Sequence, residues 1–404
     1  MRIGENAHLT YCTNIHSGET WEEVFHNIKH YTLNVKKELS QDAPFGIGLR
    51  LSQKSASTLL ERSNLDDFKN WLERENLYVF TINGFPYGAF HNVVIKDQVH
   101  TPDWTTSERL AYTCDLMTIL AELLPENMDG SVSTSPLSYK YWFKDQESVD
   151  TAKKDACASL AKIVAQLVGI KNATGKLLHL DLEPEPDGFL ENTQEVIDFF
   201  KDYLLKVGVL ELQKQLKCSE ETAKQHLLLH IQICYDVCHF ALAYESPEHV
   251  ISNLQKEGIN IGKVQISAAI KCKRSSNVPI NIQQKHLRQF DEPTYLHQSV
   301  IKLDDGKLLH FSDLSEGIQT MAHKDFKELR THFHVPIFLS NFDVLQSTQN
   351  DIIKALKLWK QKAYSNHLEV ETYTWSILPK ALQTSLTASI SRELEWVQKQ
   401  LANF

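Results

Sequence analysis

The stretch that decides the fold is HLLLHIQICYDVCH, residues 226–239. Its middle is apolar almost throughout, which is typical of a strand in a parallel sheet that is covered on both faces. The run stops at Asp236, and His239 follows three residues later. Asp236 could simply cap a following helix, with His239 in the first turn, so this stretch alone leaves two interpretations open.

Seven further short runs of strand-forming residues, several of them apolar almost throughout, are spread along the 404 residues. They lie at 8–12, 45–51, 77–83, 131–135, 177–183, 263–270 and 368–375. Longer amphipathic stretches separate them, and eight strands alternating with helices predict an α/β protein with a (β/α)8 TIM barrel. An open doubly wound sheet is the alternative. No glycine-rich phosphate-binding sequence follows the first strand, which weakens the dinucleotide-binding form of that alternative.

The helical stretches carry their own start and stop signals. Thr20 precedes a long amphipathic stretch and Glu23 follows three residues later, which is the pattern of a capping box. Two later stretches are expected to end at Gly169 and Gly208, because glycine is the common residue just past a helix C-terminus.

The last two predicted strands are separated by about a hundred residues, which is too many for one helical crossover. The segment 271–366 must therefore carry extra elements, including a strand-like run THFHVPIFL at 331–339. No repeat, low-complexity linker or abrupt change of composition divides the chain. We expect one domain over 1–404, with this insertion and a C-terminal helix at about 380–404.

Composition narrows the class of protein. The net charge of −9 argues against a dedicated nucleic-acid binder, which needs a basic face. No apolar run reaches membrane-spanning length, and the first residues, MRIGENAHLTYC, lack the regions of a signal peptide, so we expect a cytoplasmic protein without membrane insertion. Seven scattered cysteines without a C-x-x-C pair indicate reduced thiols.

Polar side chains collect where the predicted strands end, which is where barrel enzymes carry their chemistry. The residues concerned are Asp181, Glu183, Asp236, Gln265, Ser267, Glu369 and Glu371. We expect one of Glu369 and Glu371 to point inward and the other away from the barrel. Buried carboxylates without a partner are costly, so the group indicates a cation, and one divalent metal ion with oxygen ligands explains it.

The pattern of Glu183, D-x-x-H at 236–239 and E-T at 371–372 resembles that of the xylose isomerase-like TIM barrels, which include sugar isomerases and epimerases and endonuclease IV-type nucleases. Longer stretches resemble the EboE family of metabolite traffic proteins. These are HLTYCTNIHSGETWEEV, PFGIGLRLS, YVFTINGFPYGAFH, IKDQVHTPDW, DEPTYLHQ, HFHVPIF and LEVETYTW. The resemblance runs from residue 8 to about residue 380.

The resemblance implies three metal ligands: Glu183, Asp236 and Glu371. The fourth ligand in that superfamily is usually a histidine of the seventh strand, and here the matching residue is Gln265. Three carboxylates and an amide suit Mn²⁺ or Mg²⁺ better than Zn²⁺, which stays possible. His332 and His334 could face the same cavity and restore a nitrogen ligand, or they could be ordinary strand histidines.

The resemblance also implies that His239 contacts the substrate, or a second metal ion as in the nucleases. Other residues predicted to line the mouth of the barrel are His8, His16, Arg50, Asn83, Phe85, Tyr87 and His91. Phe85 and Tyr87 could form walls for a sugar-like ring or belong to the core. A buried Arg50 needs an anion, which could be Asp181 or a carboxylate or phosphate of the substrate.

These residues support three hypotheses about function. The first is a metal-dependent isomerase or epimerase of a sugar, cyclitol or other small polyol, with Glu183 and Glu371 as the base and acid pair. The second is a non-catalytic protein that binds and passes on such a metabolite, as the EboE resemblance implies. The third, an endonuclease IV-like phosphodiesterase, is disfavoured by Gln265 and by the acidic net charge.

Overall fold

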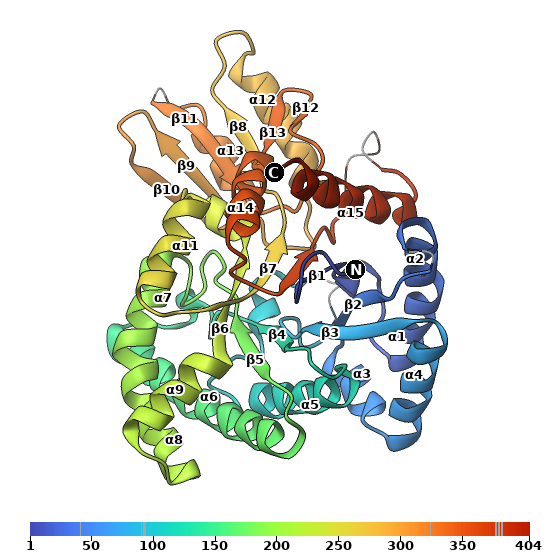
Figure 1. Cartoon of the computed structure of the whole chain (residues 1–404). Helices are drawn as coiled ribbons and strands as arrows, with labels where there is room; N and C mark the ends of the chain where they lie inside the picture. Colours follow the sequence, from blue (N-terminus) through green and yellow to red (C-terminus); the bar gives the residue numbers. More distant parts are fainter. Residues whose placement is uncertain are drawn as a thin grey trace.

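Eight parallel strands form the central sheet of the computed structural model (Figure 1), which describes residues 1–40, 42–89, 91, 94–323, 325–375, 378, 380 and 383–404. They are β1 (His8–Tyr11), β2 (Phe45–Arg50), β3 (Leu77–Asn83), β4 (Gly130–Thr134), β5 (Leu178–Leu182), β6 (Ile231–Asp236), β7 (Ile261–Ile266) and β14 (His367–Val370). Their order is β1-β14-β7-β6-β5-β4-β3-β2. All eight predicted strands are present, and the predicted barrel is confirmed.

The two end strands of that order, β1 and β2, meet at a seam. A parallel bridge joins Cys12 to Gly48 there, and the hydroxyl of Thr10 donates to the carbonyl oxygen of Gly46 at 2.7 Å. The sheet therefore curves into a nearly closed barrel. The alternative of an open doubly wound sheet is wrong.

Helices cover the outside of the barrel (Figure 1). They are α1 (Trp21–Asn27), α2 (Leu33–Leu39), α3 (Gln53–Leu59), α4 (Arg62–Arg74), α5 (Ser107–Leu123), α6 (Gln146–Thr174), α7 (Thr193–Phe199), α8 (Val209–Leu216), α9 (Glu220–His230), α10 (Val237–Leu242), α11 (Pro247–Lys256), α14 (Gln349–Gln361) and α15 (Leu386–Asn403). The π-helical segments η2 (Ile28–Thr32) and η5 (Phe200–Gly208) continue α1 and α7. Four short 3-10 segments are η1 (Thr13–Ile15), η3 (Lys96–His100), η4 (Lys140–Trp142) and η6 (Arg288–Phe290). The capping box of Thr20 and Glu23 is confirmed at the start of α1.

The predicted helix ends at Gly169 and Gly208 are wrong. Helix α6 runs past Gly169 and ends before Gly175, which has the left-handed φ of 76°. The helical chain likewise continues through Gly208 into α8. Helix α8 ends before Lys217, which has the left-handed φ of 51°. A glycine inside a helix costs about 1 kcal/mol, which the packing of an apolar helix face outweighs.

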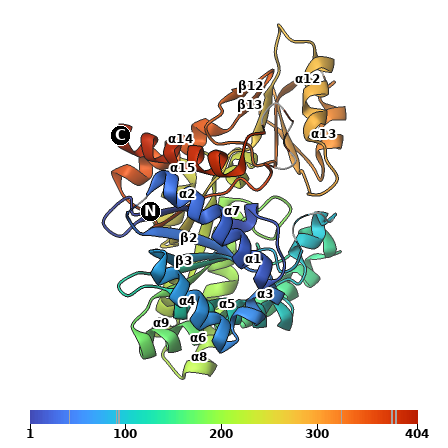
Figure 2. The same cartoon turned by 90° about the vertical axis from the view of Figure 1, so that its right-hand side faces the viewer.

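A second sheet is inserted between β7 and β14 and stands at the C-terminal end of the barrel strands (Figures 1 and 2). Its antiparallel strands are β8 (Ile270–Lys273), β9 (Ser299–Leu303), β10 (Leu308–Phe311), β11 (Phe326–Thr331), β12 (Asn341–Phe342) and β13 (Leu345–Ser347), in the order β10-β9-β11-β8-β13-β12. Helices α12 (Ile280–Leu287) and α13 (Leu314–Thr320) accompany it. Helix α14 then leads the chain back to β14.

The predicted strand at 331–339 is largely wrong, because β11 ends at Thr331. Beyond this point the chain leaves the inserted sheet and turns onto the barrel, where the N–H of Val335 donates to the carbonyl oxygen of Ala268 at 3.0 Å. The two histidines of the run, His332 and His334, therefore lie at the mouth of the barrel rather than within a strand.

The C-terminal helix starts later than the expected residue 380. Ser385 is the N-cap of α15 and its side chain accepts from the N–H of Ala388. Residues 381 and 382 of the expected helix lie outside the described part of the chain. Among the helices that the structure describes, none combines the length and apolar character needed to cross a bilayer.

Candidate metal centre

Three carboxylates converge at the C-terminal end of the barrel. Glu183 directly follows β5, Asp236 ends β6 and Glu371 directly follows β14. One carboxylate oxygen of each residue lies within 4.8 Å of the other two, and all three side chains are buried. The structure thus brings together the three residues that the strand ends and the family resemblance singled out.

Asp236 has two functions in the structure. Its Oδ1 accepts from the backbone N–H of His239 at 3.0 Å and from the Ser267 hydroxyl at 2.7 Å. The first of these bonds caps α10, so the helix-cap interpretation of this residue is confirmed. Its Oδ2 has no hydrogen-bond partner among the described residues and is available to the cluster.

Glu371 is held in place by two asparagines. Its Oε1 accepts from the side-chain amides of Asn14 at 2.8 Å and Asn83 at 3.0 Å. Asn83 was predicted to line the mouth of the barrel, whereas Asn14 was missed. Its position shortly after the first strand, at the same end of the barrel as the acids, is the signal that would have identified it.

The electrostatics of the cluster call for a cation. Burial, and then the neighbouring carboxylates, raise the pKa of Glu183 and of Glu371 well above the ordinary value. Glu183 Oε2, Asp236 Oδ2 and His334 Nε2 are buried and lack hydrogen-bond partners in the described part of the chain. Buried polar atoms in that state cost several kcal/mol unless something compensates them, and a divalent ion would serve all three.

His334 offers the nitrogen donor of this site. Its Nδ1 lies 2.7 Å from the carbonyl oxygen of Glu371 and must donate to it, so Nε2 carries the lone pair. That Nε2 lies 4.0 Å from Oδ2 of Asp236. Burial lowers the pKa of His334 to about 4, which keeps the ring neutral and able to bind a metal.

Gln265, the predicted ligand of the seventh strand, lies inside the barrel. The strand register places it beside Asp236 on β6 and Glu369 on β14. Its side chain is buried, and both amide atoms lack a hydrogen-bond partner among the described residues. An amide in this state has an oxygen free to bind an ion.

The expectation that only one of Glu369 and Glu371 faces inward is wrong. Alternate residues of a strand share a face, and both side chains are buried in the barrel. Oε2 of Glu369 lies 2.6 Å from Nζ of Lys263, with neither side chain exposed. Gly48 leaves room for this carboxylate, because a Cβ there would lie 1.7 Å from its Oε1.

A second group of ligand-type side chains lies beside the three carboxylates. Nδ1 of His239 donates to the carbonyl oxygen of Pro184, and Nδ1 of His332 donates to Oε1 of Gln298, each at 2.9 Å. The two Nε2 atoms therefore carry lone pairs and face each other at 3.1 Å. With Glu185 they form a set within 4.8 Å that could hold a second ion or a hydroxyl hydrogen of a ligand.

Glu185 was missed in the sequence, although it lies two residues beyond Glu183 in LDLEPEP. Burial, and then Asp236, raise its pKa well above the ordinary value. His332 and His334 lie beyond the end of β11 and beside these carboxylates, so they are not residues of a strand, and their role as ligands stays a prediction.

A cavity of about 50 Å³ lies over the centre. The residues that line it are Asn14, Asn83, Phe85, Pro86, Val99, Glu183, Glu185, His239, His332, His334, Glu371 and Tyr373. Phe85 thus forms a wall, whereas Tyr87 packs edge-on against Tyr112. The volume accommodates an ion and a few water molecules.

Arg50 does not pair with Asp181. Its Nη1 lies 3.0 Å from Oε1 of Glu19, and it does not line the cavity. Asp181 instead accepts from Nδ1 of His179 at 2.6 Å, lower in the barrel. Each of the two predicted partners therefore has a different partner.

Three histidines predicted at the mouth do not line the cavity. His8 begins β1, at the far end of the barrel, and its Nδ1 bonds the Tyr78 hydroxyl at 2.7 Å. Nε2 of His16 lies 3.1 Å from the Tyr11 hydroxyl. His91 donates to the carbonyl oxygen of Asn14 at 2.5 Å and so supports a residue that touches Glu371.

Comparison with known proteins defines the fold. No protein-family model and no curated protein sequence matches the chain. A xylose isomerase-like TIM barrel protein from Mycobacterium smegmatis, solved with magnesium, is similar over 100% of this chain and 99% of its own, at 11% identity and a TM-score of 0.50. The chain therefore has the fold of the xylose isomerase-like TIM barrels.

Two further solved structures are less similar. The IOLI protein with a bound zinc atom has 11% identity and a TM-score of 0.46, over 98% of both chains. A xylose isomerase domain containing protein from Salmonella typhimurium has 12% identity and a TM-score of 0.44, over 100% of this chain and 99% of its own. The comparisons do not reach the EboE family, and that resemblance stays a prediction.

Proposed function

We propose that the protein is a divalent-metal-dependent isomerase or epimerase of a small sugar, cyclitol or related hydroxy ketone. The observation that carries the proposal is the convergence of Glu183, Asp236 and Glu371, with His334 beside them, at the end of the barrel where such folds hold their chemistry. A bound divalent ion would polarise neighbouring carbonyl and hydroxyl oxygens of a substrate, which makes the proton on the intervening carbon easier to remove.

The existing hydrogen bonds of each carboxylate indicate its role in the proposed reaction. Asp236 is a ligand only, because its Oδ1 is committed to the helix cap and to Ser267. Glu183 has a carboxylate oxygen without a hydrogen-bond partner among the described residues and is the better candidate for the base. Glu371, restrained by its two asparagines, would return the proton on the other side.

We assign the paired histidines His239 and His332 to substrate binding. Both line the cavity, and the lone pair of an Nε2 atom there would accept from a hydroxyl group of the substrate. Asn83 and His91 act by positioning, since one holds Glu371 and the other holds Asn14.

The donor set also bears on the choice of ion. Three carboxylates and the Gln265 amide favour Mn²⁺ or Mg²⁺. An imidazole from His334 in place of the amide would keep Mn²⁺ suitable and would make Zn²⁺ suitable as well.

Hydrogen exchange at carbon tests the proposal. Purified protein loaded with Mn²⁺ is incubated in D₂O with a panel of small sugars and cyclitol ketones, and proton NMR follows the carbon next to the carbonyl. We expect deuterium uptake and an isomeric product. Glu183→Gln should abolish the uptake while the variant stays folded, and Glu220→Gln, an exposed change on α9, should leave it unaltered. Uptake retained in Glu183→Gln contradicts the assignment of the base.

The second candidate is a non-catalytic protein that binds a metabolite and passes it on, in line with the resemblance to the EboE family. Calorimetry that detects binding of a panel compound, without deuterium uptake or product, favours this candidate. The nuclease is the least supported function, because a net charge of −9 provides no basic face for a phosphate backbone.

A further inference from the structure

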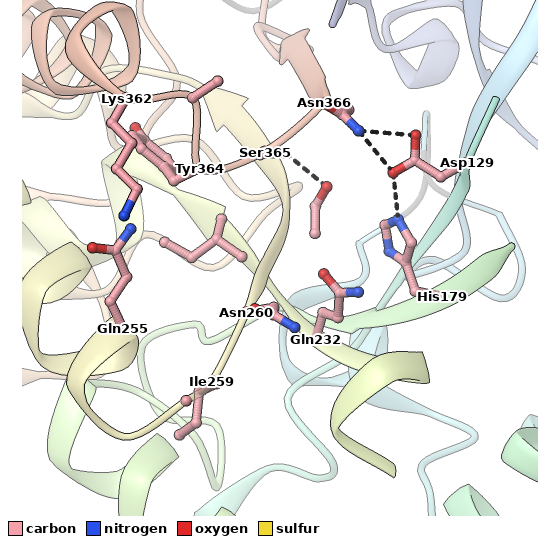
Figure 3. Close-up of a pocket in the computed structure, with 14 residues that line it drawn as sticks. Asp129, His179, Gln232, Gln255, Ile259, Asn260, Lys362, Tyr364, Ser365 and Asn366 are labelled. Atoms are coloured by element: carbon pink, nitrogen blue, oxygen red, sulfur yellow. Dashed lines mark hydrogen bonds and ion pairs between the residues drawn. The ribbon is translucent and has the colours of Figure 1, made fainter. Parts of the chain in front are cut away.

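A separate group of ligand-type side chains lies at the N-terminal end of the barrel. Asp129 precedes β4, His179 lies near the start of β5 and His367 begins β14. Oδ2 of Asp129 lies 3.3 Å from Nε2 of His367 and 3.7 Å from Nε2 of His179. Figure 3 shows Asp129 and His179 directed toward each other at the edge of a pocket.

Asp181 fixes the orientation of the His179 ring. Its Nδ1 lies 2.6 Å from Oδ1 of Asp181, whose Oδ2 accepts from the Ser131 hydroxyl at 2.7 Å. The carboxylate accepts a hydrogen bond from the Nδ1–H of His179 and so directs Nε2 at Asp129. A carboxylate behind a histidine is the usual support of a metal-binding imidazole, because it fixes the tautomer and increases the basicity of the free nitrogen.

His367 is the most deeply buried member of the group. It is 1% exposed, its Nδ1 has no hydrogen-bond partner among the described residues, and its Nε2 faces only the Asp129 carboxylate, 3.3 Å away. Its ring packs edge-on against His179, with centroids 5.2 Å apart, and stacks on Phe80. Its Nε2 faces the Asp129 carboxylate, so a buried imidazole points into the group.

Asp129 connects the group to solvent. Nδ2 of Asn366 contacts both of its oxygens, at 3.1 and 3.2 Å, and so fixes the plane of the carboxylate. Its side chain is 24% exposed and lines a pocket of about 500 Å³, which Gln232, Asn260 and Tyr364 also line (Figure 3). An ion at this point has a path of entry and an open coordination position.

We propose that Asp129, His179 and His367 bind a Zn²⁺ ion whose remaining position faces the pocket. Ligand atoms about 2.0–2.1 Å from a tetrahedral zinc ion lie about 3.4 Å from one another, close to the two separations seen here. Two imidazole nitrogens with one carboxylate favour zinc over Mg²⁺ or Mn²⁺. This site is independent of the proposed function and of the carboxylate centre.

A proton is the competing occupant. An imidazolium at His179 would satisfy both Asp181 and Asp129 without a metal ion. Both histidines would then share the one carboxylate of Asp129, whereas a zinc ion would bind one atom of each of the three residues. The ion would also tie β14 to β5 and to the segment before β4, across the bottom of the barrel.

Zinc binding to the full chain tests the proposal. We compare the number and affinity of Zn²⁺ ions bound by the wild type and by Asp129→Asn, using calorimetry and metal analysis. Asp129→Asn should lose one ion, or bind it at least ~100-fold more weakly, because one ligand in three is lost. Glu126→Gln, an exposed change in the same segment, is the matched control and should bind as the wild type does.

Two further measurements separate this site from the carboxylate centre and from a folding defect. Co²⁺ in place of Zn²⁺ should give the intense visible bands of a tetrahedral ion in the wild type and in Asp236→Asn but not in Asp129→Asn. Crystals of the wild type soaked in Zn²⁺ should show an anomalous peak within bonding distance of Nε2 of His367. Equal zinc binding by the wild type and Asp129→Asn, or no peak at His367, overturns the proposal.

Discussion

Nδ1 of His334 donates to the carbonyl oxygen of Glu371 across 2.7 Å, so the segment that follows β11 meets the end of the last barrel strand at the carboxylate centre. The bond leaves the other ring nitrogen of His334 as an acceptor that faces Asp236. The seventh strand carries Gln265, and the insertion that follows this strand brings an imidazole to the cavity over the carboxylate centre.

Replacing His334 should therefore weaken metal binding. We expect His334→Gln to lower the affinity for Mn²⁺ by ~10–100-fold, as measured by calorimetry, because the nitrogen donor next to Asp236 is lost. His323→Ala, an exposed change in the same insertion, should leave the affinity unaltered. An unchanged affinity in His334→Gln would show that the ring is not a ligand.

Metal removal should lower stability. An ion that binds only the folded chain, at 100 times its dissociation constant, adds about 2.7 kcal/mol to the free energy of unfolding. We expect urea denaturation to show an increase of that size on addition of Mn²⁺ to chelator-treated protein. The increase should be absent in Asp236→Asn, where the central ligand is neutral. A Mn²⁺ effect of equal size in both proteins would place the ion elsewhere.

The barrel strands could be predicted because their signal is local. Most are short apolar runs closed by polar residues, and such runs are expected to be buried on both faces of the sheet. The two helix ends were mispredicted for the opposite reason, since Gly169 and Gly208 are locally permitted stops that packing overrides. The inserted sheet could not be predicted in detail, because β8 pairs with β11 and β13, far along the chain.

The same contrast between local and long-range information applies to the carboxylate centre. Glu183, Asp236 and Glu371 were found because parallel strands end at one edge, so positions in sequence translate directly into positions in space. The place of His334 depends on how the insertion folds back onto the barrel, and no local pattern carries that information. Lys263 in the barrel interior was not expected either. For its partner Glu369, the sequence predicted only that one of Glu369 and Glu371 points inward.

Replacing only one member of the Lys263–Glu369 pair should lower the stability of the protein. Both side chains are fully buried with Nζ and Oε2 2.6 Å apart, so removal of one charge leaves the other unpaired in the core. We expect Lys263→Met to lower the free energy of unfolding by about 3–5 kcal/mol, as measured by urea denaturation. The double variant Lys263→Met, Glu369→Gln should recover a large part of the loss, since no uncompensated charge remains. A double variant that is less stable than Lys263→Met contradicts this explanation.

Glu393 should make stability depend on pH. This α15 carboxyl accepts from the backbone N–H of Ile337 at 3.1 Å and from the Thr372 hydroxyl at 2.8 Å, and burial raises its pKa from 4.5 to about 8. Unfolding between these values releases its proton, so its contribution to stability is complete below pH 4.5 and is lost as the pH rises to 8.

Glu393→Gln removes this titration and keeps an oxygen that accepts both hydrogen bonds. The stability of the variant relative to the wild type should therefore rise from pH 5 to pH 8, by up to about 1.4 kcal/mol for each pH unit. Urea denaturation at four pH values measures the slope. Glu395→Gln, a more exposed change on the same helix, should show no slope, and a flat difference for Glu393→Gln would mean that the buried carboxyl is ionised throughout.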